Sequence, residues 1–316
     1  MTQQKTLDKL TLISLWHVYF KFASLFFTSK NFKYSVFNGY RRINPELVDT
    51  VEITSGSWGV VFKGRSNDGS DVVVKVVPTH FSSVEATAFE RLRQHQSSGQ
   101  LHPRKHGSLM CARFSKYDEQ NLKTLFVMDY HLGESLLSFI SRHPEGVSEE
   151  RARPIIEGML DCVELVHQMD MIHLDLKAEH FVIGKETGLV LVDFGAAFLC
   201  SENGCSPRTD LMSMGRSHYG TLTCSAPETF RDECCTGSDM WNIGVLTYAL
   251  LIGDPPWLQD GTQEKYIRTA SFNRACARWQ HLSANGRAFI ESLLRVEPEQ
   301  RMSLADCRSH GFLRGT

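Results

Sequence analysis

Two short apolar runs, each leading into an acidic residue, place the strongest constraint on this chain. Residues 171–172 precede the turn that holds Asp175, and residues 189–192 (LVLV) lead directly into Asp193. Runs of this kind indicate short strands that touch turns, so two carboxylates are expected on neighbouring strand ends. Such a pair suits one task, in which one carboxylate orients or accepts a proton and the other holds a cation. Lys177 adds a positive charge to the first turn.

Composition narrows the class of protein. The 316 residues suffice for one large domain or two lobes, and the apolar content of 42% is that of an ordinary globular chain. A net charge of -2 gives no strongly basic face, so we expect no direct nucleic-acid partner. The nine cysteines are odd in number and form no C-x-x-C pair. They indicate reduced thiols in an intracellular compartment, most simply the cytoplasm, and not a disulfide framework or a zinc ribbon.

Residues 1–46 form an apolar and aromatic N-terminal extension. A spanning helix needs about 20 apolar residues, and His17 and Lys21 interrupt the run at 10–27. No small-residue cleavage site follows it. We expect this segment to pack on the domain that follows it, and contact with a membrane interface is the less favoured alternative.

Residues 48–78 predict three strands joined by two turns. The first turn holds Gly56 and Gly59, which let backbone amides approach a phosphate closely, although any hairpin can carry two glycines. Lys75 lies among valines in the third strand, where its ammonium group requires an anionic partner.

A helix is expected from about Ser82, with that serine or its neighbour as the cap. Glu85 then shares the inward face with two large apolar residues, whereas Glu90 lies on a different face. Glu85 is therefore the favoured partner of Lys75, in a pair that also meets phosphate oxygens.

These blocks resemble the small lobe of protein kinases of the eukaryotic type. Residues 54–61 (TSGSWGVV) resemble G-x-G-x-x-G-x-V with Thr54 in place of the first glycine, and residues 72–75 (VVVK) resemble V-A-I-K. Residues 125–128 are similar to the strand that leads to the hinge. The resemblance implies an ATP site formed by Ile53, Thr54, Ser55, Gly56, Ser57, Trp58, Gly59, Val60, Val61, Lys75, Glu85, Met128, Asp129, His131 and Glu134.

Within that set the resemblance implies particular roles. Met128 would be the gatekeeper, the backbones of Asp129 and His131 would bind adenine, and Glu134 would lie near the ribose. A methionine at position 128 is equally compatible with plain core packing.

The opening runs resemble the catalytic segment of the same family, H-x-D-x-K followed by D-F-G. The resemblance implies that Asp175 orients or accepts the proton of the attacking hydroxyl, that Lys177 lies near the transferred phosphoryl group and that Asp193 holds Mg²⁺. Residues 220–228 (GTLTCSAPE) resemble G-T-x-x-Y-x-A-P-E, in which Thr221 braces the catalytic Asp and Lys. Together with Lys177, this block is typical of the serine/threonine branch.

Two residues depart from the family pattern. His180 stands where the family has an Asn that binds a second Mg²⁺, and neutral imidazole is a poor ligand for a hard cation, so weak catalysis or a use of Mn²⁺ is an alternative. Leu174 replaces the Arg that pairs with a phosphorylated loop, so we expect phosphorylation not to be the main switch. The loop that follows residue 195 still offers candidate phosphosites at Ser213, Ser217 and Tyr219.

The second half of the chain reads as mostly helical. Residues 148–168 have core spacing at Ile155, Ile156, Met159, Leu160, Val163, Leu165 and Val166. Residues 239–251 are nearly all apolar, which indicates a buried helix that ends before the prolines at 255–256. By the resemblance, Arg301 pairs with Glu228.

The sequence therefore predicts an α+β fold with the two lobes of a protein kinase. Residues 47–313 would form the kinase domain, with lobes at about 47–128 and 132–313. The expected function is an ATP- and Mg²⁺-dependent serine/threonine kinase acting on proteins. A pseudokinase or scaffold is the alternative that His180 supports, while residues 226–228 speak against a kinase of small molecules. The departures are similar to those of divergent kinases of large DNA viruses, for which a nuclear or host-cell location is the alternative.

Overall fold

The structure is a computed structural model that describes residues 47–56, 59–98, 106–118, 122–184, 188–200, 221–257 and 261–316. Predictions for residues 1–46, Ser57, Trp58 and the three candidate phosphosites lie outside these ranges. The chain divides into two units, and each is described by itself. The first unit comprises Met1–Ser83 and Ala112–Tyr130, and the second comprises Val84–Cys111 and His131–Thr316.

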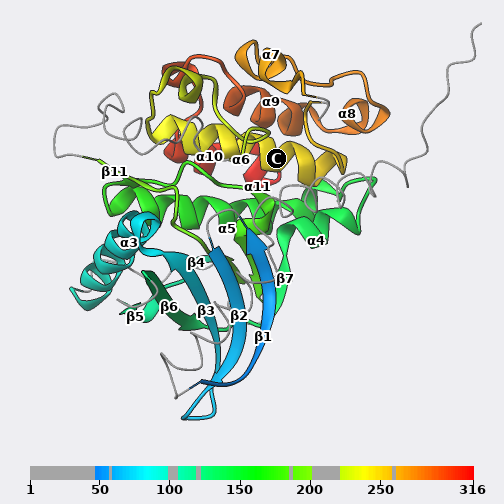
Figure 1. The fold of residues 1–316 in the computed structure, drawn as a ribbon. Coiled ribbons are helices and arrows are strands. Elements are labelled where there is room, and N and C mark those ends of the chain that lie inside the picture. The colour runs from blue at the N-terminus through cyan, green and yellow to red at the C-terminus, as the bar shows by residue number, and fades with distance from the viewer. Residues whose placement is uncertain are drawn as a thin grey trace, which may run out of the picture. The chain divides into compact units, whose positions relative to one another are not determined.

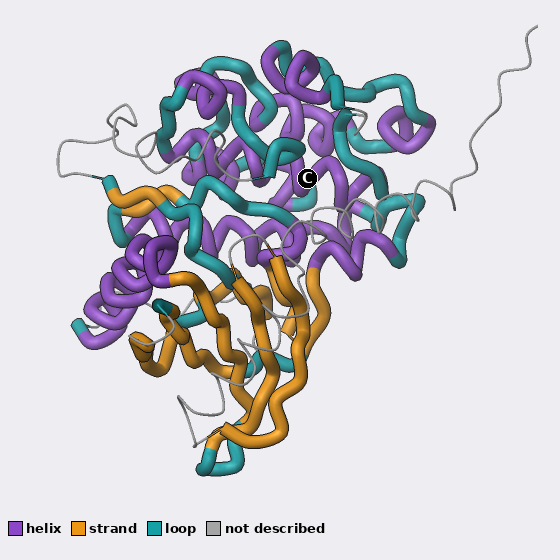
Figure 2. The backbone as a smooth tube through the Cα atoms, viewed as in Figure 1, coloured by secondary structure: helices purple, strands orange, loops and turns teal. Residues whose placement is uncertain are grey.

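The first unit is built on a five-stranded antiparallel sheet (Figures 1 and 2). Its strand order is β1-β2-β3-β6-β5, with bounds β1 Leu47–Gly56, β2 Gly59–Ser66, β3 Asp71–Pro78, β5 Ala112–Asp118 and β6 Lys123–Asp129. The three strands predicted in residues 48–78 are all present. Alternate residues of β2 are buried, and the core on that face consists of Val60, Phe62, Val72, Val74, Val76, Leu125 and Val127.

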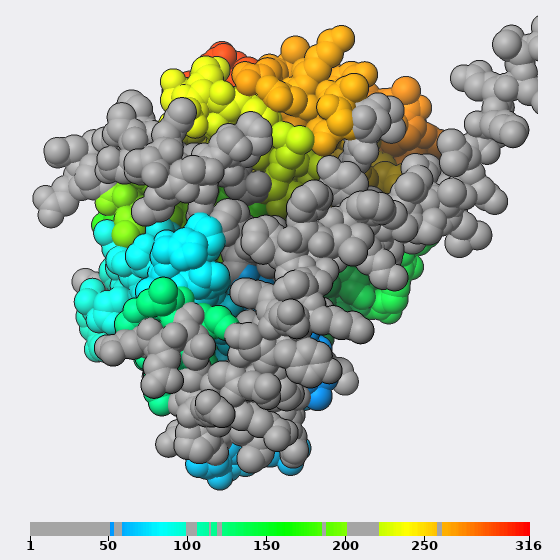
Figure 3. All heavy atoms as spheres, viewed as in Figure 1, coloured from blue at the N-terminus to red at the C-terminus, as the bar shows by residue number. Residues whose placement is uncertain are grey.

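Helix α3 (Thr79–Ser97) follows β3 directly and begins earlier than the sequence predicted. The prediction that Ser82 or Ser83 caps the helix is wrong. The Ser82 hydroxyl donates to the carbonyl of Thr79 and also forms a hydrogen bond with the Thr124 hydroxyl of β6, both at 2.8 Å. The predicted inward face of the helix is correct, since Glu85, Phe89 and Leu92 are all buried. Glu90 is exposed, as its position on a different face requires. Part of the surface of α3 is visible as cyan atoms in Figure 3.

The second unit is mostly helical, as predicted (Figure 2). Besides most of α3, its helices are α4 Leu136–Ser141, α5 Glu149–Gln168, α6 Thr236–Ile252, α7 Gln263–Arg268, α8 Ala277–His281, α9 Ala284–Leu293, α10 Leu304–Ser309 and α11 Gly311–Arg314. Two further short sheets carry the site, with orders β4-β10-β9-β7 and β11-β8. Their strands are β4 Gly107–Leu109, β7 Gly133–Ser135, β8 Met171–Ile172, β9 Phe181–Gly184, β10 Gly188–Leu191 and β11 Phe198–Leu199.

Helices α5 and α6 form the centre of this unit. The Ser148 hydroxyl caps α5 by accepting from the amide of Arg151 at 3.4 Å. Of the predicted core positions in α5 only Ile155 is not fully buried. Helix α6 is buried along almost its whole length, and it ends at Gly253, whose left-handed φ of 90° stops the helix before the prolines are reached.

No helix in the described ranges is long and apolar enough to cross a membrane.

Candidate active site

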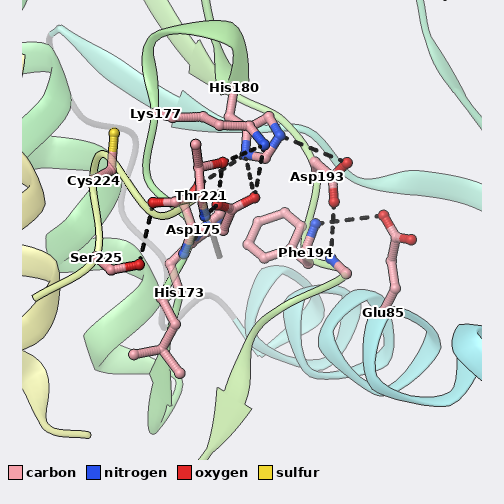
Figure 4. A network of polar contacts seen from close by, with 12 residues as sticks. Glu85, His173, Asp175, Lys177, His180, Asp193, Phe194, Thr221, Cys224 and Ser225 are labelled. Carbon is pink, nitrogen blue, oxygen red and sulfur yellow. Dashed lines mark hydrogen bonds and ion pairs between the residues drawn. The ribbon is translucent and has the colours of Figure 1, made fainter. Parts of the chain in front are cut away.

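The β9–β10 hairpin brings the turn after β8 next to the acid that follows β10. Phe181 of β9 lies opposite Leu191 of β10, and the amide of Val192 donates to the carbonyl of His180 at 2.8 Å. Because the pairing continues to the open end of the hairpin, His180 and Asp193 face each other there (Figure 4).

Asp175 lies at the centre of a dense hydrogen-bond network (Figure 4). Its Oδ1 accepts from the amide of Thr221 at 2.7 Å and from the Thr221 hydroxyl at 3.1 Å. Its Oδ2 accepts from the Lys177 ammonium group at 3.0 Å. That ammonium group also donates to the Thr221 hydroxyl at 3.0 Å. The three predicted catalytic residues are therefore in mutual contact.

Electrostatics keep Lys177 charged inside this network. Burial acts against its ammonium form, but the neighbouring carboxylates Asp175 and Glu179 raise the pKa of Lys177 above its ordinary value. Burial raises the pKa of Glu179 in turn, which Lys177 partly offsets. Asp175 and Lys177 thus form a partly buried ion pair. Their side chains remain 13% and 20% exposed to solvent.

His180 lies between the two acids. Its Nδ1 is 2.8 Å from the carbonyl oxygen of Asp175, and its Nε2 is 3.9 Å from Oδ2 of Asp193. Burial lowers the pKa of His180, although both carboxylates oppose this shift. Asp193 itself has a left-handed φ of 72°, and its Oδ1 accepts from the amide of Gly195 at 2.9 Å.

Phe194 anchors this turn in the interior of the second unit. Its ring packs against Phe89 at 5.8 Å and against His173 at 5.5 Å between centroids. Its amide donates to the buried Glu85 carboxylate at 3.4 Å (Figure 4). The placement of Glu85 is therefore coupled to the turn that carries Asp193, a link that the sequence analysis missed.

Asp239 is the most important site residue that the sequence analysis did not single out. Its Oδ2 accepts from the amide of His173 and its Oδ1 from the amide of Leu174, both at 2.9 Å. Nε2 of His167 is also 2.9 Å from Oδ2. Burial opposes the ionised form, but the hydrogen bond and charge of His167 hold the pKa of Asp239 below its ordinary value. An acid at the start of an otherwise apolar helix was the available signal.

Leu174 occupies an apolar environment. It is buried with Ile172 and Cys234, and Phe198 and Cys200 pack against this cluster. Strand β11 begins at Phe198 and pairs with β8, so the start of the loop after residue 195 is held by apolar contacts. Nothing in this cluster offers a cation for a phosphate.

A buried ion pair joins Glu228, which follows Thr221 along the chain, to Arg301. Arg301 donates from Nη1 to Oε1 of Glu228 at 2.7 Å and from Nη2 to Oε2 at 2.6 Å. Both side chains are almost fully buried, and the Ser238 hydroxyl also donates to Glu228 at 2.7 Å. This pair was predicted from the family pattern.

In the first unit, the described residues that were predicted to bind ATP lie on the sheet. Ile53 of β1 is exposed, whereas Val60 of β2 is buried, and β1 and β2 also carry Thr54, Ser55, Gly56, Gly59 and Val61. A Cβ on Gly59 would lie 2.3 Å from the carbonyl oxygen of Val76, so the backbone there requires glycine. Lys75 is buried in β3, opposite Val61 and Phe126. Its pairing with Glu85 of the second unit stays a prediction.

The predicted hinge residues are divided between the two units. Met128 is buried in β6 opposite Val73, as its core interpretation requires. The Asp129 carboxylate accepts from Nε of Arg113 at 2.6 Å. In the second unit, His131 is half-exposed and Glu134 of β7 forms an ion pair with Arg142, so its contact with a ribose stays a prediction.

The chain combines a unit built on an antiparallel sheet with a helical unit that carries an Asp–Lys–Thr network. This combination is that of the protein kinases, which have a two-lobe α+β fold. The family model for the protein kinase domain matches residues 47–313. The chain belongs to the protein kinase family.

Relatives named as serine/threonine kinases agree with this assignment. The chain is 27% identical over 266 residues to serine/threonine-protein kinase dkf-2 of Caenorhabditis briggsae, which covers 81% of this chain and 21% of that protein. It is 26% identical over 263 residues to CBL-interacting serine/threonine-protein kinase 16 of Arabidopsis thaliana, covering 80% and 54%. It is 28% identical over 269 residues to human serine/threonine-protein kinase D2, covering 82% and 28%. This chain thus spans about half or less of the length of these relatives.

Proposed function

We propose that this chain is an ATP-dependent serine/threonine protein kinase that uses a divalent cation, Mg²⁺ or Mn²⁺. The observation that carries the proposal is the network in which Lys177 and Thr221 both contact Asp175. The matching family and the names of the relatives support the same activity and protein substrates.

Asp175 is suited to orient and deprotonate a hydroxyl group. An ionised carboxylate oxygen can accept about two hydrogen bonds, and Oδ1 already accepts two from Thr221. Oδ2 accepts one from Lys177, so it is the oxygen that can receive the proton of a serine or threonine hydroxyl. The hydrogen bonds to Thr221 hold the carboxylate plane, so this oxygen keeps its direction when a substrate arrives.

Lys177 provides charge beside the reacting hydroxyl. Its ammonium group contacts Asp175 and Thr221 with two of its three donors, which leaves one donor for a phosphoryl oxygen. The raised pKa keeps this group protonated through the physiological range. Negative charge that develops on the transferred group is therefore stabilised without reorganisation of the protein.

The residues around Asp193 fit a divalent cation bound with a nucleotide. ATP supplies the phosphoryl group, and a cation that bridges its phosphates neutralises their charge. The Asp193 carboxylate offers hard oxygen ligands and is one third exposed, and the His180 ring lies beside it. In the described part of the chain no group of three or more His, Cys, Asp and Glu residues gathers as a metal site. Nucleotide oxygens would then complete the coordination.

Activity is proposed to be independent of loop phosphorylation. Leu174 fills the position from which an Arg would contact a loop phosphate, and it is buried in an apolar cluster with Ile172 and Cys234. Phosphatase treatment is expected to leave the rate unchanged, which a kinase assay before and after treatment measures.

The decisive test is transfer of radiolabelled phosphate from ATP to a basic protein such as histone. Asp175→Asn keeps the shape of the side chain and removes its basicity, so kcat should fall by about 10²- to 10⁴-fold. Asp254→Asn, which changes an exposed carboxylate, is the matched control and should retain full activity. Phosphoamino-acid analysis of the product should show phosphoserine or phosphothreonine.

A pseudokinase that binds nucleotide or partners without efficient transfer is the second candidate. His180 favours it, because this residue replaces a ligand for a second Mg²⁺ with an imidazole. Equal and negligible incorporation by the unmodified chain and Asp175→Asn, in both Mg²⁺ and Mn²⁺, would replace the kinase proposal by this one.

A further inference from the structure

The His180 ring has a defined hydrogen-bonding direction. A carbonyl oxygen only accepts, so Nδ1, at 2.8 Å from the carbonyl of Asp175, carries the proton of that hydrogen bond. The electron pair of the neutral ring then lies on Nε2. This nitrogen faces Oδ2 of Asp193 at 3.9 Å (Figure 4).

This arrangement is the one that metal-binding histidines adopt. A ligating His commonly donates its other ring N–H to a backbone carbonyl, which fixes both the tautomer and the orientation of the ring. His180 makes that bond to Asp175. The open end of the β9–β10 hairpin adds rigidity, because the carbonyl of His180 accepts from Val192 at 2.8 Å.

The distance between the two facing atoms suits a cation. An ionised carboxylate and an unprotonated ring nitrogen both accept, so they do not bond each other directly. Their separation of 3.9 Å is less than twice the ligand distance of about 2.1 Å that is usual for divalent ions of this size. Both atoms therefore lie within reach of one ion.

The kind of ligand selects the kind of ion. Mg²⁺ prefers oxygen ligands, whereas first-row transition ions accept imidazole nitrogen. Mn²⁺ combines that tolerance with affinity for carboxylate and phosphate oxygens. Since the described residues provide no third ligand of the His, Cys, Asp or Glu type here, the remaining ligands would be oxygens of the nucleotide and water.

We propose that His180 is a direct nitrogen ligand, through Nε2, of a divalent cation that Asp193 and the nucleotide phosphates also bind, and that it shifts the preference of this position from Mg²⁺ to Mn²⁺. The inference rests on the proposed nucleotide-dependent function, but it concerns binding and not transfer. By this proposal His180, which departs from the family pattern, determines which cation binds.

The test is pulsed electron paramagnetic resonance of Mn²⁺ bound to the full chain with the methylene analogue of ATP. This analogue has no nitrogen in its phosphate bridge, and protein labelled with ¹⁵N only in histidine separates the ring from the adenine. Electron spin echo modulation should show imidazole ¹⁴N coupling in unlabelled protein and its replacement by ¹⁵N coupling in labelled protein. His180→Asn should lose this signal, while His281→Asn, which removes an exposed imidazole, should keep it.

Calorimetric titration of the same complexes with Mn²⁺ and Mg²⁺ gives the second readout. The ratio of the Mn²⁺ and Mg²⁺ dissociation constants should change at least about tenfold toward Mg²⁺ in His180→Asn. Mn²⁺ bound without histidine coupling, or an unchanged ratio in the variant, would overturn the proposal. Thermal melts without metal show that each variant is folded.

The two proposals fail separately. Histidine coupling in a chain that transfers no phosphate would reject the kinase function and retain the nitrogen ligand. Full activity in Mg²⁺ with no coupling would reject the ligand and retain the kinase.

Discussion

The two halves of the catalytic segment differ in how their polar atoms are satisfied. Around Asp175, both carboxylate oxygens receive donors from Lys177 and Thr221. Between His180 and Asp193, two acceptors face each other across 3.9 Å. The contacts of the first half join residues of the protein, whereas our proposal places a cation between the two facing atoms of the second half. Substitutions around Asp175 should therefore change stability or turnover without any ligand. By our proposal, substitution of His180 should act mainly when cation and nucleotide are bound.

The largest effect is expected at the buried pair of Glu228 and Arg301, the extreme case of a network satisfied by the protein. Arg301→Met leaves Glu228 buried without its cation, which should lower the free energy of unfolding by about 3–5 kcal/mol. Urea unfolding followed by circular dichroism measures this change. Arg274→Met, which breaks the exposed pair with Glu291, should cost less than about 1 kcal/mol. Similar losses in both variants would contradict the distinction.

A smaller loss is expected for Asp239→Asn. The amide group cannot accept from all three neighbours of Asp239, so the variant should lose about 1–3 kcal/mol of stability. Because the pKa of Asp239 is depressed in the folded state, its contribution is present above the ordinary aspartate pKa and is lost as pH falls through the folded value. When the free energy of unfolding is measured from pH 7 to pH 3, it should therefore fall less steeply with decreasing pH in the variant than in the unmodified chain. Equal slopes for the two proteins would contradict this prediction.

Thr221→Ala tests whether the network around Asp175 governs turnover. The variant loses the hydroxyl that donates to Asp175 and accepts from Lys177, so kcat should fall about 10- to 100-fold with an unchanged KM for ATP. Thr221→Ser should restore most of the rate. Thr223→Ala is the control, because that hydroxyl makes only a 4.0 Å contact with the Cys224 sulfur. A rise in KM with no change in kcat would place Thr221 in nucleotide binding instead.

The smallest effect on the free protein is expected at His180. Asn at position 180 can still donate to the Asp175 carbonyl, so His180→Asn should change stability by no more than about 1 kcal/mol without ligands. With Mn²⁺ and the nucleotide analogue, the unmodified chain should gain more in melting temperature than the variant. A large loss in the absence of ligands would mean that the His180 ring is a structural element.

Much of the fold could be predicted because it depends on local pattern. The continuous valines of β3 predict a strand buried on both faces, and the apolar spacing of α5 predicts a helix buried on one face. The start of α3 could not be predicted, because the hydroxyl of Ser82 bonds Thr124 on a distant strand and does not cap the helix. Such a contact depends on tertiary structure, which residue spacing does not contain.

In the candidate site, too, some residues could be predicted from the sequence and others could not. Asp175, Lys177 and Thr221 were predicted from the family pattern, and the structure brings them together across 44 to 46 residues of sequence. The role of Asp239, which binds the amides of His173 and Leu174 from another helix, was missed. Sequence order shows that an acid is present, but only packing shows that its partners are backbone amides.

The pair of Glu228 and Arg301 also has a consequence for how the protein is made. Its two members are 73 residues apart, and the ribosome produces Glu228 first. At a translation rate of about 5–20 residues per second, Arg301 is synthesised roughly 4–15 s after Glu228. Until Arg301 emerges, burial of Glu228 would leave an uncompensated buried charge, so the second unit should complete its packing only after residue 301 has been synthesised.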